Sequence, residues 1–288
     1  MRRELAAVYD ELLRRQQAGE KSIYLTDEAV RILKEIAETA EPVDESATPE
    51  AVEPVAVKKK AVRKKTAPVV EVPAPPRVVL PEGTRQEQWD ALREQVMSDP
   101  WCQSQVKPGK KVVLGVGSLE ARIFFCGEAP GADEEIAGEP FVGPAGQLLT
   151  KIIQAMGLQR GDVYIGNIMN YRPPMPTPVG NRAPELNEMA YCLPYLRAQL
   201  DIVQPELVVA LGNTAVEGLL GHDPKRRIGQ IRGGWMEYNG IPLIPTFHPS
   251  YLLRNQSMAT KRLVWEDMLK VMDRLKMPVS DKQRGFFK

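Results

Sequence analysis

Cysteine, histidine and long apolar runs are all scarce in this chain of 288 residues. Its three cysteines, Cys102, Cys126 and Cys192, follow no regular spacing, which argues against a disulfide framework and suits a reducing cytoplasm. No apolar stretch approaches the roughly 20 residues of a membrane span, and the charged N-terminal sequence is not typical of a signal peptide. The net charge of +1 neither favours nor excludes a nucleic-acid partner. A DNA-binding protein of this composition would need basic residues clustered on one face.

The composition divides the chain into segments. In residues 1–40, apolar side chains at helical spacing predict a small helical segment. Residues 41–83 are rich in Pro, Ala, Val, Glu and Lys, which predicts a disordered linker. The basic runs of this linker fit either a solvated spacer or a nonspecific tether to phosphates. Residues 278–288 form a C-terminal tail whose aromatics, Phe286 and Phe287, fit either packing on the domain or docking in a replication-clamp groove.

Residues 84–277 predict one α/β domain. Strands are expected at 121–126, 162–168, 206–211 and 242–247, and helices at 84–98, 144–156, 184–203, 213–220 and 258–275. A hairpin-like stretch from Gly234 to Ile241 precedes the last strand. Because strands and helices alternate, we expect a largely buried parallel sheet with helices on both faces.

Polar residues and tight turns follow three of the predicted strands. Glu128 comes directly after the first strand, Asn167 ends the second, and His248 follows the last. Between the first two, a loop rich in glycine and proline carries one large apolar group, Phe141. Ligands bind at the carboxyl ends of strands in open α/β sheets, so we expect these side chains to share one crevice. A carboxylate, an amide, an imidazole and an aromatic ring predict a base-sized pocket.

Several motifs occur in a family-like order. They are Gly127–Gly131, Glu139–Gly143, Gly166–Ile168, Arg172–Pro174 and His248–Asn255. With this order and spacing, residues 100–275 resemble family-4 uracil-DNA glycosylases. The resemblance implies the uracil-DNA glycosylase fold, a three-layer α/β/α sandwich with a short, mainly parallel central sheet. It also implies a monofunctional base-excision repair enzyme, which flips uracil out of DNA and hydrolyses its N-glycosidic bond to leave an abasic site.

The resemblance assigns catalytic roles to three residues. Glu128 would position or activate the attacking water, Asn167 would pair with the uracil edge, and His248 would hydrogen-bond the O2 side as negative charge builds there. Substrate-binding residues would also include Gly127, Ala129 and Gly131, which leave room for the base, and Phe141, which stacks on it. Taken singly, each of these residues has a structural alternative, such as a turn carboxylate, a turn-closing amide or a core aromatic. The order of the motifs is what favours the active-site interpretation.

The same resemblance predicts how DNA is held. Leu252 and Leu253 would form an apolar wedge that fills the space left by the flipped nucleotide. Arg172, Ser250 and Arg254 are expected to contact phosphates.

The sequence departs from the family where an iron–sulfur cluster is usually held by four cysteines. Cys102 and Cys192 match two of these positions, while Tyr171 stands at a third and Cys126 is expected in the core. With half of the ligands gone, we expect no cluster and no other cofactor. The chain has two histidines, one of them assigned to catalysis, which also argues against a zinc site.

A basic string, Lys225–Ile228, resembles the Lys-Arg-Arg-Ile-His loop of glycosylases that trap their product covalently. Here Gly229 replaces the histidine and the loop follows a different strand, so covalent trapping is not predicted. The string fits either a solvated surface loop or a basic loop near DNA.

Two other classes of function fit the sequence less well than uracil excision. A noncatalytic DNA-binding relative would not need Glu128, and a Rossmann-type nucleotide enzyme would need a glycine-rich phosphate loop that no predicted strand carries. A glycosylase of the same superfamily with other or broader deaminated-base specificity stays open. We expect a monomer in the cytoplasm, with DNA as its partner and no membrane association.

Overall fold

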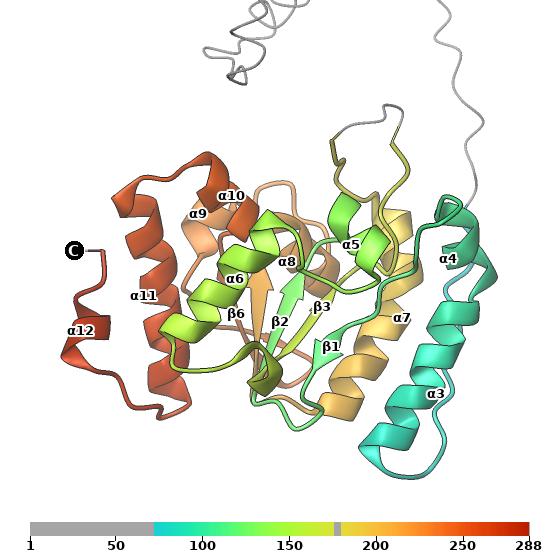
Figure 1. Cartoon of the computed structure of the whole chain (residues 1–288), viewed down its shortest axis with the longest axis horizontal. Helices are drawn as coiled ribbons and strands as arrows, with labels where there is room; N and C mark the ends of the chain where they lie inside the picture. The colour runs from blue at the N-terminus through green and yellow to red at the C-terminus, as the bar shows by residue number, and fades with distance from the viewer. Residues whose placement is uncertain (1–71, 176–179, 288) are drawn as a thin grey trace, which may run out of the picture. The chain divides into compact units, whose positions relative to one another are not determined.

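The computed structural model describes residues 72–175 and 180–287, and in this part of the chain a six-stranded sheet forms the centre (Figure 1). Its strands are β1 (Val116–Gly117), β2 (Ile123–Gly127), β3 (Tyr164–Asn167), β4 (Leu207–Leu211), β5 (Met236–Tyr238) and β6 (Ile241–Thr246). They lie in the order β1-β3-β2-β4-β6-β5, with the four inner strands parallel and both edge strands antiparallel. The mainly parallel sheet and the hairpin before the last strand are confirmed, whereas β1 was not predicted.

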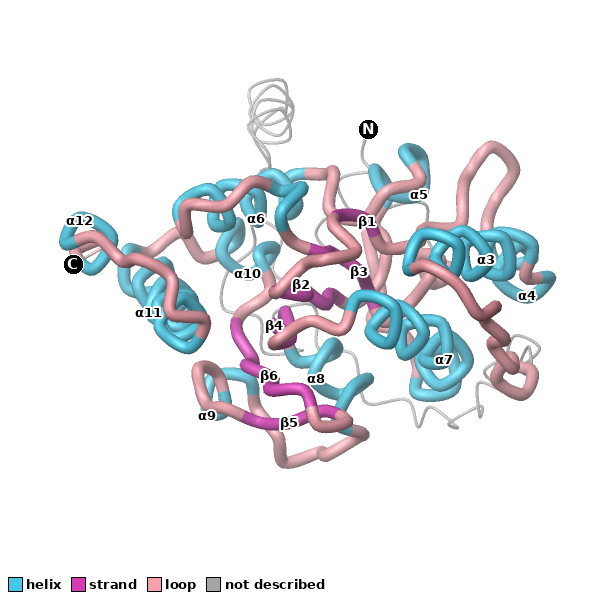
Figure 2. The backbone as a smooth tube through the Cα atoms, turned by 90° about the horizontal axis from the view of Figure 1, so that it is seen from below, coloured by secondary structure: helices cyan, strands magenta, loops and turns pink. Residues whose placement is uncertain are grey.

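Helices cover both faces of this sheet (Figure 2). One face carries α3 (Arg85–Ser98), α7 (Leu186–Val203) and α8 (Asn213–Leu220), and the other carries α6 (Pro144–Ala155) and α11 (Met258–Arg274). Shorter elements are α4 (Pro100–Gln105), α5 (Ala132–Ala137), η1 (Arg160–Asp162), α9 (Ile228–Ile231), α10 (Pro249–Arg254) and α12 (Asp281–Arg284). None of the helices in the described residues is long and apolar enough to cross a membrane. The three-layer α/β/α architecture implied by the resemblance is confirmed.

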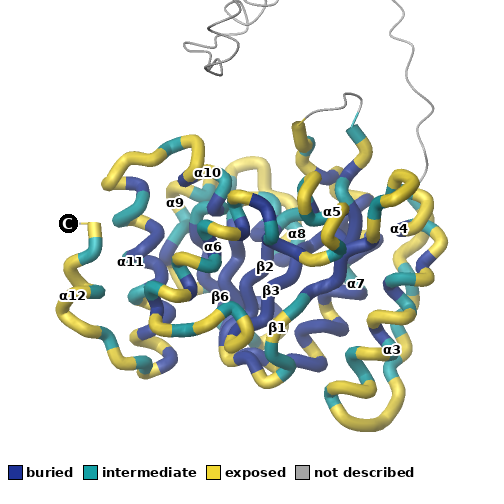
Figure 3. Tube along the Cα trace, viewed as in Figure 1, coloured by how far each residue is buried: buried dark blue, intermediate teal, exposed yellow. Residues whose placement is uncertain are grey.

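The inner strands are continuous apolar runs because both of their faces are covered. Along β2, Phe124 and Cys126 belong to the core shared with α3, α7 and α8. The alternate residues, Ile123 and Phe125, belong to the core shared with α6 and α11. Every residue of β2 is buried, as are all residues of β3 and β4 (Figure 3).

The strand register brings the predicted polar residues to one edge. Gly127 of β2 pairs with Asn167 of β3, so the residue after Gly127 lies beside the end of β3. Leu211 of β4 likewise pairs with Thr246 of β6. Four consecutive parallel strands therefore end side by side, and the residues that follow them share the carboxyl edge of the sheet.

Both ends of the described chain pack on this domain. Val78 and Leu80 lie against the core, and Gln95 of α3 hydrogen-bonds both backbone groups of Val79, so packed structure starts before the predicted boundary at residue 84. The predictions for residues 1–40, and for 41–83 up to residue 71, lie outside the described residues. In the C-terminal tail, the ring of Phe286 lies 5.3 Å from that of Trp265 in α11, while Phe287 is 39% exposed.

Candidate active site

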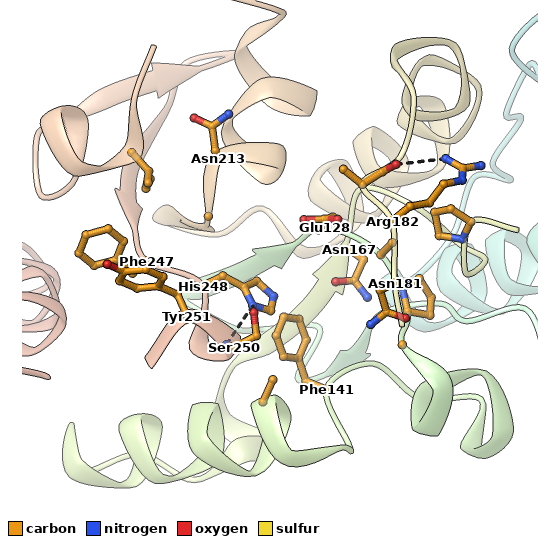
Figure 4. A pocket seen from close by; sticks show the side chains of 18 of the residues that line it. Glu128, Phe141, Asn167, Asn181, Arg182, Asn213, Phe247, His248, Ser250 and Tyr251 are labelled. Atoms are coloured by element: carbon orange, nitrogen blue, oxygen red, sulfur yellow. Dashed lines mark hydrogen bonds between the residues drawn. The ribbon is translucent and has the colours of Figure 1, made fainter. Parts of the chain in front are cut away.

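A cavity of about 840 Å³ opens at the carboxyl edge of the sheet. Four of the predicted residues line it: Glu128 after β2, Phe141 before α6, Asn167 at the end of β3, and His248 after β6. Figure 4 shows Phe141, Asn167 and His248 close together around the same opening. Ala129 and Gly131 line it as well. The structure therefore brings these separate segments of the sequence together at one cavity.

The amide of Asn167 is a buried part of the cavity lining. Its side chain is only 6% exposed, and its Oδ1 has no hydrogen-bond partner among the described residues. Gly127 lies directly beneath it, since a Cβ at this position would come within 2.3 Å of Asn167 Oδ1 and 2.5 Å of Phe141 Cζ. A buried amide oxygen without a partner is costly in a protein, and because Asn167 lines the cavity, a ligand donor that reached this atom would supply the missing hydrogen bond.

The aromatic ring of Phe141 is held by an unusual backbone conformation. Its φ of 55° lies in the left-handed region, which a bulky residue adopts only when its surroundings require it. The Glu134 carboxylate accepts hydrogen bonds from the N–H groups of Val142 and Gly143, each at 3.0 Å, and from Gly131 N–H at 3.1 Å. Glu134 therefore joins the loop after β2 to the loop that carries Phe141.

His248 caps the N-terminus of α10, and this role fixes its tautomer. The Ser250 N–H donates to His248 Nδ1 at 3.1 Å, and the Ser250 hydroxyl lies 2.8 Å from the same atom (Figure 4). Because Nδ1 accepts, the proton of the neutral ring resides on Nε2. Burial, reinforced by the nearby charge of Arg254, lowers the pKa of His248 to about 4. At neutral pH the ring is an uncharged Nε2–H donor, and its centroid lies 5.6 Å from that of Phe141.

Glu128, which follows β2, is half-buried and lies near Asn167 (Figure 4). Burial raises the pKa of its carboxyl group above the ordinary value, while a hydrogen bond from Thr214 and the charge of Arg254 oppose that rise. A carboxylate with a raised pKa is suited to accept a proton from a water molecule.

Two of the predicted DNA contacts are engaged or buried within the protein. Arg172 is not a free cation, because its guanidinium donates to Glu135 Oε1 and Asn181 Oδ1, both at 2.9 Å, and to the Gly180 carbonyl. These bonds hold the loop that follows β3, and Arg172 also lines the cavity. Leu252 is only 5% exposed and packs inside the protein, so it is not available as a wedge.

The other predicted contacts differ in how accessible they are. Leu253 is 37% exposed and Arg254 is exposed on the cavity wall. Ser250 lines the cavity, but its hydroxyl faces His248.

Several residues that line the cavity were not assigned to it from the sequence. They are Asn213 after β4, Phe247 and Tyr251 around His248, Asn181 and Arg182 in the loop after β3, and Arg226–Gly229. Asn213 could have been found, because Gly212-Asn213 follows β4 as Gly166-Asn167 ends β3. The basic string Lys225–Ile228 was predicted to be either a solvated loop or a basic loop near DNA, and its residues Arg226–Ile228 line the cavity.

Comparison with known proteins agrees with this geometry. Residues 114–269 match the family model of the uracil DNA glycosylase superfamily. A type-4 uracil-DNA glycosylase of Thermotoga maritima is 41% identical over 194 residues, which cover 67% of this chain and 97% of that relative. The chain belongs to the type-4 uracil-DNA glycosylases. Other type-4 relatives are those of Archaeoglobus fulgidus, 43% identical over 58% of this chain and 84% of the relative, and Saccharolobus solfataricus, 38% identical over 58% and 77%.

In this type-4 member, the region of the family's cluster ligands is filled by the protein core. Cys102 of α4 and Cys192 of α7 are both fully buried, and a hydrogen bond to Cys192, together with burial, raises the pKa of the Cys102 thiol. Tyr171, at the third ligand position, is also fully buried and accepts a hydrogen bond from Trp101 Nε1 at 3.1 Å. Asp99 stands three residues before Cys102 and Gln105 three residues after it, so both have the spacing of the family's Cys-x-x-Cys pair, but only Asp99 of the two is buried.

Asp99 is already satisfied by protein donors. It accepts hydrogen bonds from the hydroxyls of Tyr191 at 2.9 Å and Tyr195 at 2.8 Å, and from Cys102 N–H at 2.6 Å. Burial opposes its ionisation, but these bonds together hold its pKa below the ordinary value. Two thiols, a phenol and an engaged carboxylate do not fit a cluster that requires four thiolates. Among the described residues, no group of three or more His, Cys, Asp or Glu side chains is placed to hold a metal ion.

Proposed function

We propose that this type-4 uracil-DNA glycosylase removes uracil from DNA by reading it with Asn167. The observation that carries the proposal is the buried Oδ1 of Asn167, which has no partner among the described residues and lies beside Phe141. Uracil presents an N3–H donor next to the O4 acceptor, so Oδ1 accepts from N3–H while Nδ2 donates to O4. Cytosine presents an acceptor at N3 and a donor at N4, which reverses the pattern. Such bidentate reading discriminates by about 1–3 kcal/mol.

Phe141 and His248 hold the other surfaces of the base. The Phe141 ring stacks on the flipped uracil, a contact worth about 1–3 kcal/mol. The Nε2–H of His248 donates to O2, where negative charge develops as the glycosidic bond breaks. A neutral donor is retained throughout the physiological pH range because the pKa of His248 lies at about 4. Charge stabilisation of this kind acts mainly in the transition state and therefore raises the rate.

Glu128 acts on the sugar side of the bond. The C1′–N1 bond breaks with its electron pair moving to uracil, where His248 stabilises the charge on O2. The oxygen of a water held by Glu128 forms a new bond to C1′, and its proton passes to the carboxylate and then to the departing uracil. Because water is the nucleophile, we propose a monofunctional glycosylase that leaves an abasic site in an intact strand.

The nucleotide must leave the helix before this chemistry. Flipping costs a few kcal/mol, and Leu253, on the exposed side of α10, is the leucine that can fill the vacated stack. Arg254 follows on the same helix and contacts a neighbouring phosphate. Ser250 acts chiefly by fixing the His248 ring.

The cofactor, the oligomeric state and the cellular compartment are the remaining parts of the proposal. We propose that the enzyme works without an iron–sulfur cluster, because Asp99 and Tyr171 occupy two ligand positions and are bonded to protein groups. We further propose that it acts as a monomer in the cytoplasm, a compartment that suits its three buried free thiols.

A base-swap experiment tests this function. Asn167→Asp and Asn167→Ala variants would be compared with wild type on single-strand oligonucleotides that carry one deoxyuridine or one deoxycytidine, followed by alkaline cleavage. We expect wild type to act on deoxyuridine alone, and both variants to lose about a hundredfold or more in single-turnover rate. Protonated aspartic acid can also read cytosine, so any activity on deoxycytidine should arise only in Asn167→Asp. Undiminished uracil excision by both variants would contradict the assignment of Asn167.

A further inference from the structure

Five arginines line the cavity, and they divide into two groups by their partners. Arg172 forms an ion pair with Glu135 at 2.9 Å, and Arg182 forms one with Glu188 at 2.6 Å. By contrast, Arg226, Arg227 and Arg254 have no carboxylate within salt-bridge distance among residues 72–175 and 180–287. Arg254 is already assigned to DNA above. Arg226 and Arg227 come from a separate segment that no function yet explains.

Hydrogen bonds within the loop hold the segment that carries Arg226 and Arg227 in one conformation. Arg226 donates to the Gly221 carbonyl at 2.7 Å, and Arg227 donates to the Pro224 carbonyl at 2.6 Å. The turn that leads into Arg226 is closed by Asp223, whose side chain accepts from Lys225 N–H and whose carbonyl accepts from Arg226 N–H. A guanidinium carries five N–H donors, so most donors of both arginines stay available to a ligand.

The far end of the segment is anchored in the core. α9 follows directly, and after it Arg232 forms an ion pair and paired hydrogen bonds with Asp267 of α11, which is fully buried. Asp267 also accepts from Thr246, the last residue of β6, and the adjacent Gly233 N–H donates to the Pro245 carbonyl at 2.8 Å. The loop that carries Arg226 and Arg227 is therefore tied to the strand that leads to His248.

We propose that Arg226 and Arg227 bind backbone phosphates of the DNA strand whose nucleotide occupies the cavity. Unpaired guanidinium groups favour phosphate because they offer parallel N–H donors to its oxygens. Contacts of this type position a protein on DNA without reading its sequence. The inference rests on the proposed function, and it assigns the segment Lys225–Gly229 to the DNA interface rather than to a solvated surface.

Salt dependence of binding measures such contacts. The probe is a fluorescent duplex with one tetrahydrofuran abasic-site analogue, which the enzyme cannot cut, and the Kd is measured by anisotropy between 50 and 200 mM salt. Each phosphate contact adds about 0.9 to the slope of log K against log salt. We expect the Arg226→Gln, Arg227→Gln double variant to lose about 1.8 from the slope, and each single variant about half of that. Across this salt range, wild type should lose about tenfold more affinity than the double variant.

Two further variants control for charge and folding. Arg93→Gln with Lys276→Gln removes two exposed cations from α3 and from the end of α11, away from the cavity, and should keep the wild-type slope. Arg226→Lys with Arg227→Lys keeps both charges and should keep most of the slope. Thermal melting should be unchanged in all of them, because both arginines bond only to carbonyls of their own loop.

The outcomes separate this inference from the function itself. An unchanged slope in the Arg226→Gln, Arg227→Gln variant, or an equal decrease in the Arg93→Gln, Lys276→Gln control, overturns the inference. Failure of wild type to excise uracil would instead contradict the proposed function, and the binding assay does not depend on excision.

Discussion

The carboxylate of Glu134 accepts a hydrogen bond from the backbone N–H of Val142 at 3.0 Å, directly after the strained residue Phe141. Glu134 also bonds Gly143 and Gly131, so one side chain spans the two loops that form one wall of the cavity. The left-handed backbone conformation of Phe141 is costly and is kept only while the hydrogen bonds of Glu134 hold the loop. The position of the Phe141 ring depends on that conformation.

Removing that connection should damage both stability and catalysis. We expect Glu134→Ala to lower the free energy of unfolding by about 2–4 kcal/mol, since three charge-assisted hydrogen bonds to partly buried N–H groups are lost. Glu134→Gln keeps an acceptor for Val142 and Gly143 and should be intermediate. Urea unfolding and single-turnover excision would be measured together, with Glu139→Ala as a control in the same loop. Equal excision rates for Glu134→Ala and Glu139→Ala would contradict this role.

Gly127 should tolerate no side chain. A Cβ there would lie within 2.3 Å of Asn167 Oδ1 and 2.5 Å of Phe141 Cζ, which displaces both groups that hold the base. Displacement by about 1 Å at a reacting centre can cost about a hundredfold in rate, so we expect a loss of that size for Gly127→Ala. Gly161→Ala is the matched control, because open space surrounds its Cβ. Comparable activity of the two variants in a single-turnover assay would argue against a tightly fitted pocket.

The pH dependence of excision should have a single acidic limb. Glu128 must be ionised to accept a proton from water, and burial raises its pKa above 4.5, so the rate should fall as the pH decreases through this raised value. His248 has a pKa of about 4 and stays neutral above it, so its protonation should not shape the profile between pH 5 and 8. A single-turnover profile at saturating DNA checks this. A second limb near pH 6.5 that disappears in His248→Gln would contradict the neutral donor.

Two cysteine substitutions should restore the four thiols that an iron–sulfur cluster requires. Asp99 and Tyr171 stand at the positions that complete Cys102 and Cys192, so the Asp99→Cys, Tyr171→Cys variant would carry four thiols in this part of the core. We expect this variant to acquire visible iron–sulfur absorption after anaerobic reconstitution, whereas wild type should show none. Asp99→Ser, Tyr171→Phe is the control without new thiols. Cluster absorption in wild type would overturn the account of this region.

Local sequence was sufficient for most of the sheet and for the centre of the site. Glu128, Asn167 and His248 each lie at or just after the end of an apolar strand, and parallel strands in register must end at the same edge. β1 was missed because a strand of two residues has no periodic signal, and it forms only through antiparallel pairing with β3.

The failures concern side chains whose role depends on distant partners. Arg172 was predicted to contact a phosphate, but its guanidinium donates to Glu135, which is distant in the sequence. Leu252 and Leu253 are equivalent in sequence, but the packing of the short helix α10 buries one and exposes the other. The position of Arg226 and Arg227 beside the cavity depends on the path from β4 to β6, which no local pattern reveals.

The central claim is tested most directly by a gel assay on a fluorescent oligonucleotide with one deoxyuridine, treated with alkali after incubation. Wild type, His248→Ala and Asn167→Ala would be compared in low salt under single-turnover conditions. The account predicts strand breaks at the uracil position with wild type, only after alkali, and at least about a hundredfold slower reaction with either variant. No alkali-dependent cleavage by folded wild type, or equal cleavage by all three proteins, would contradict it.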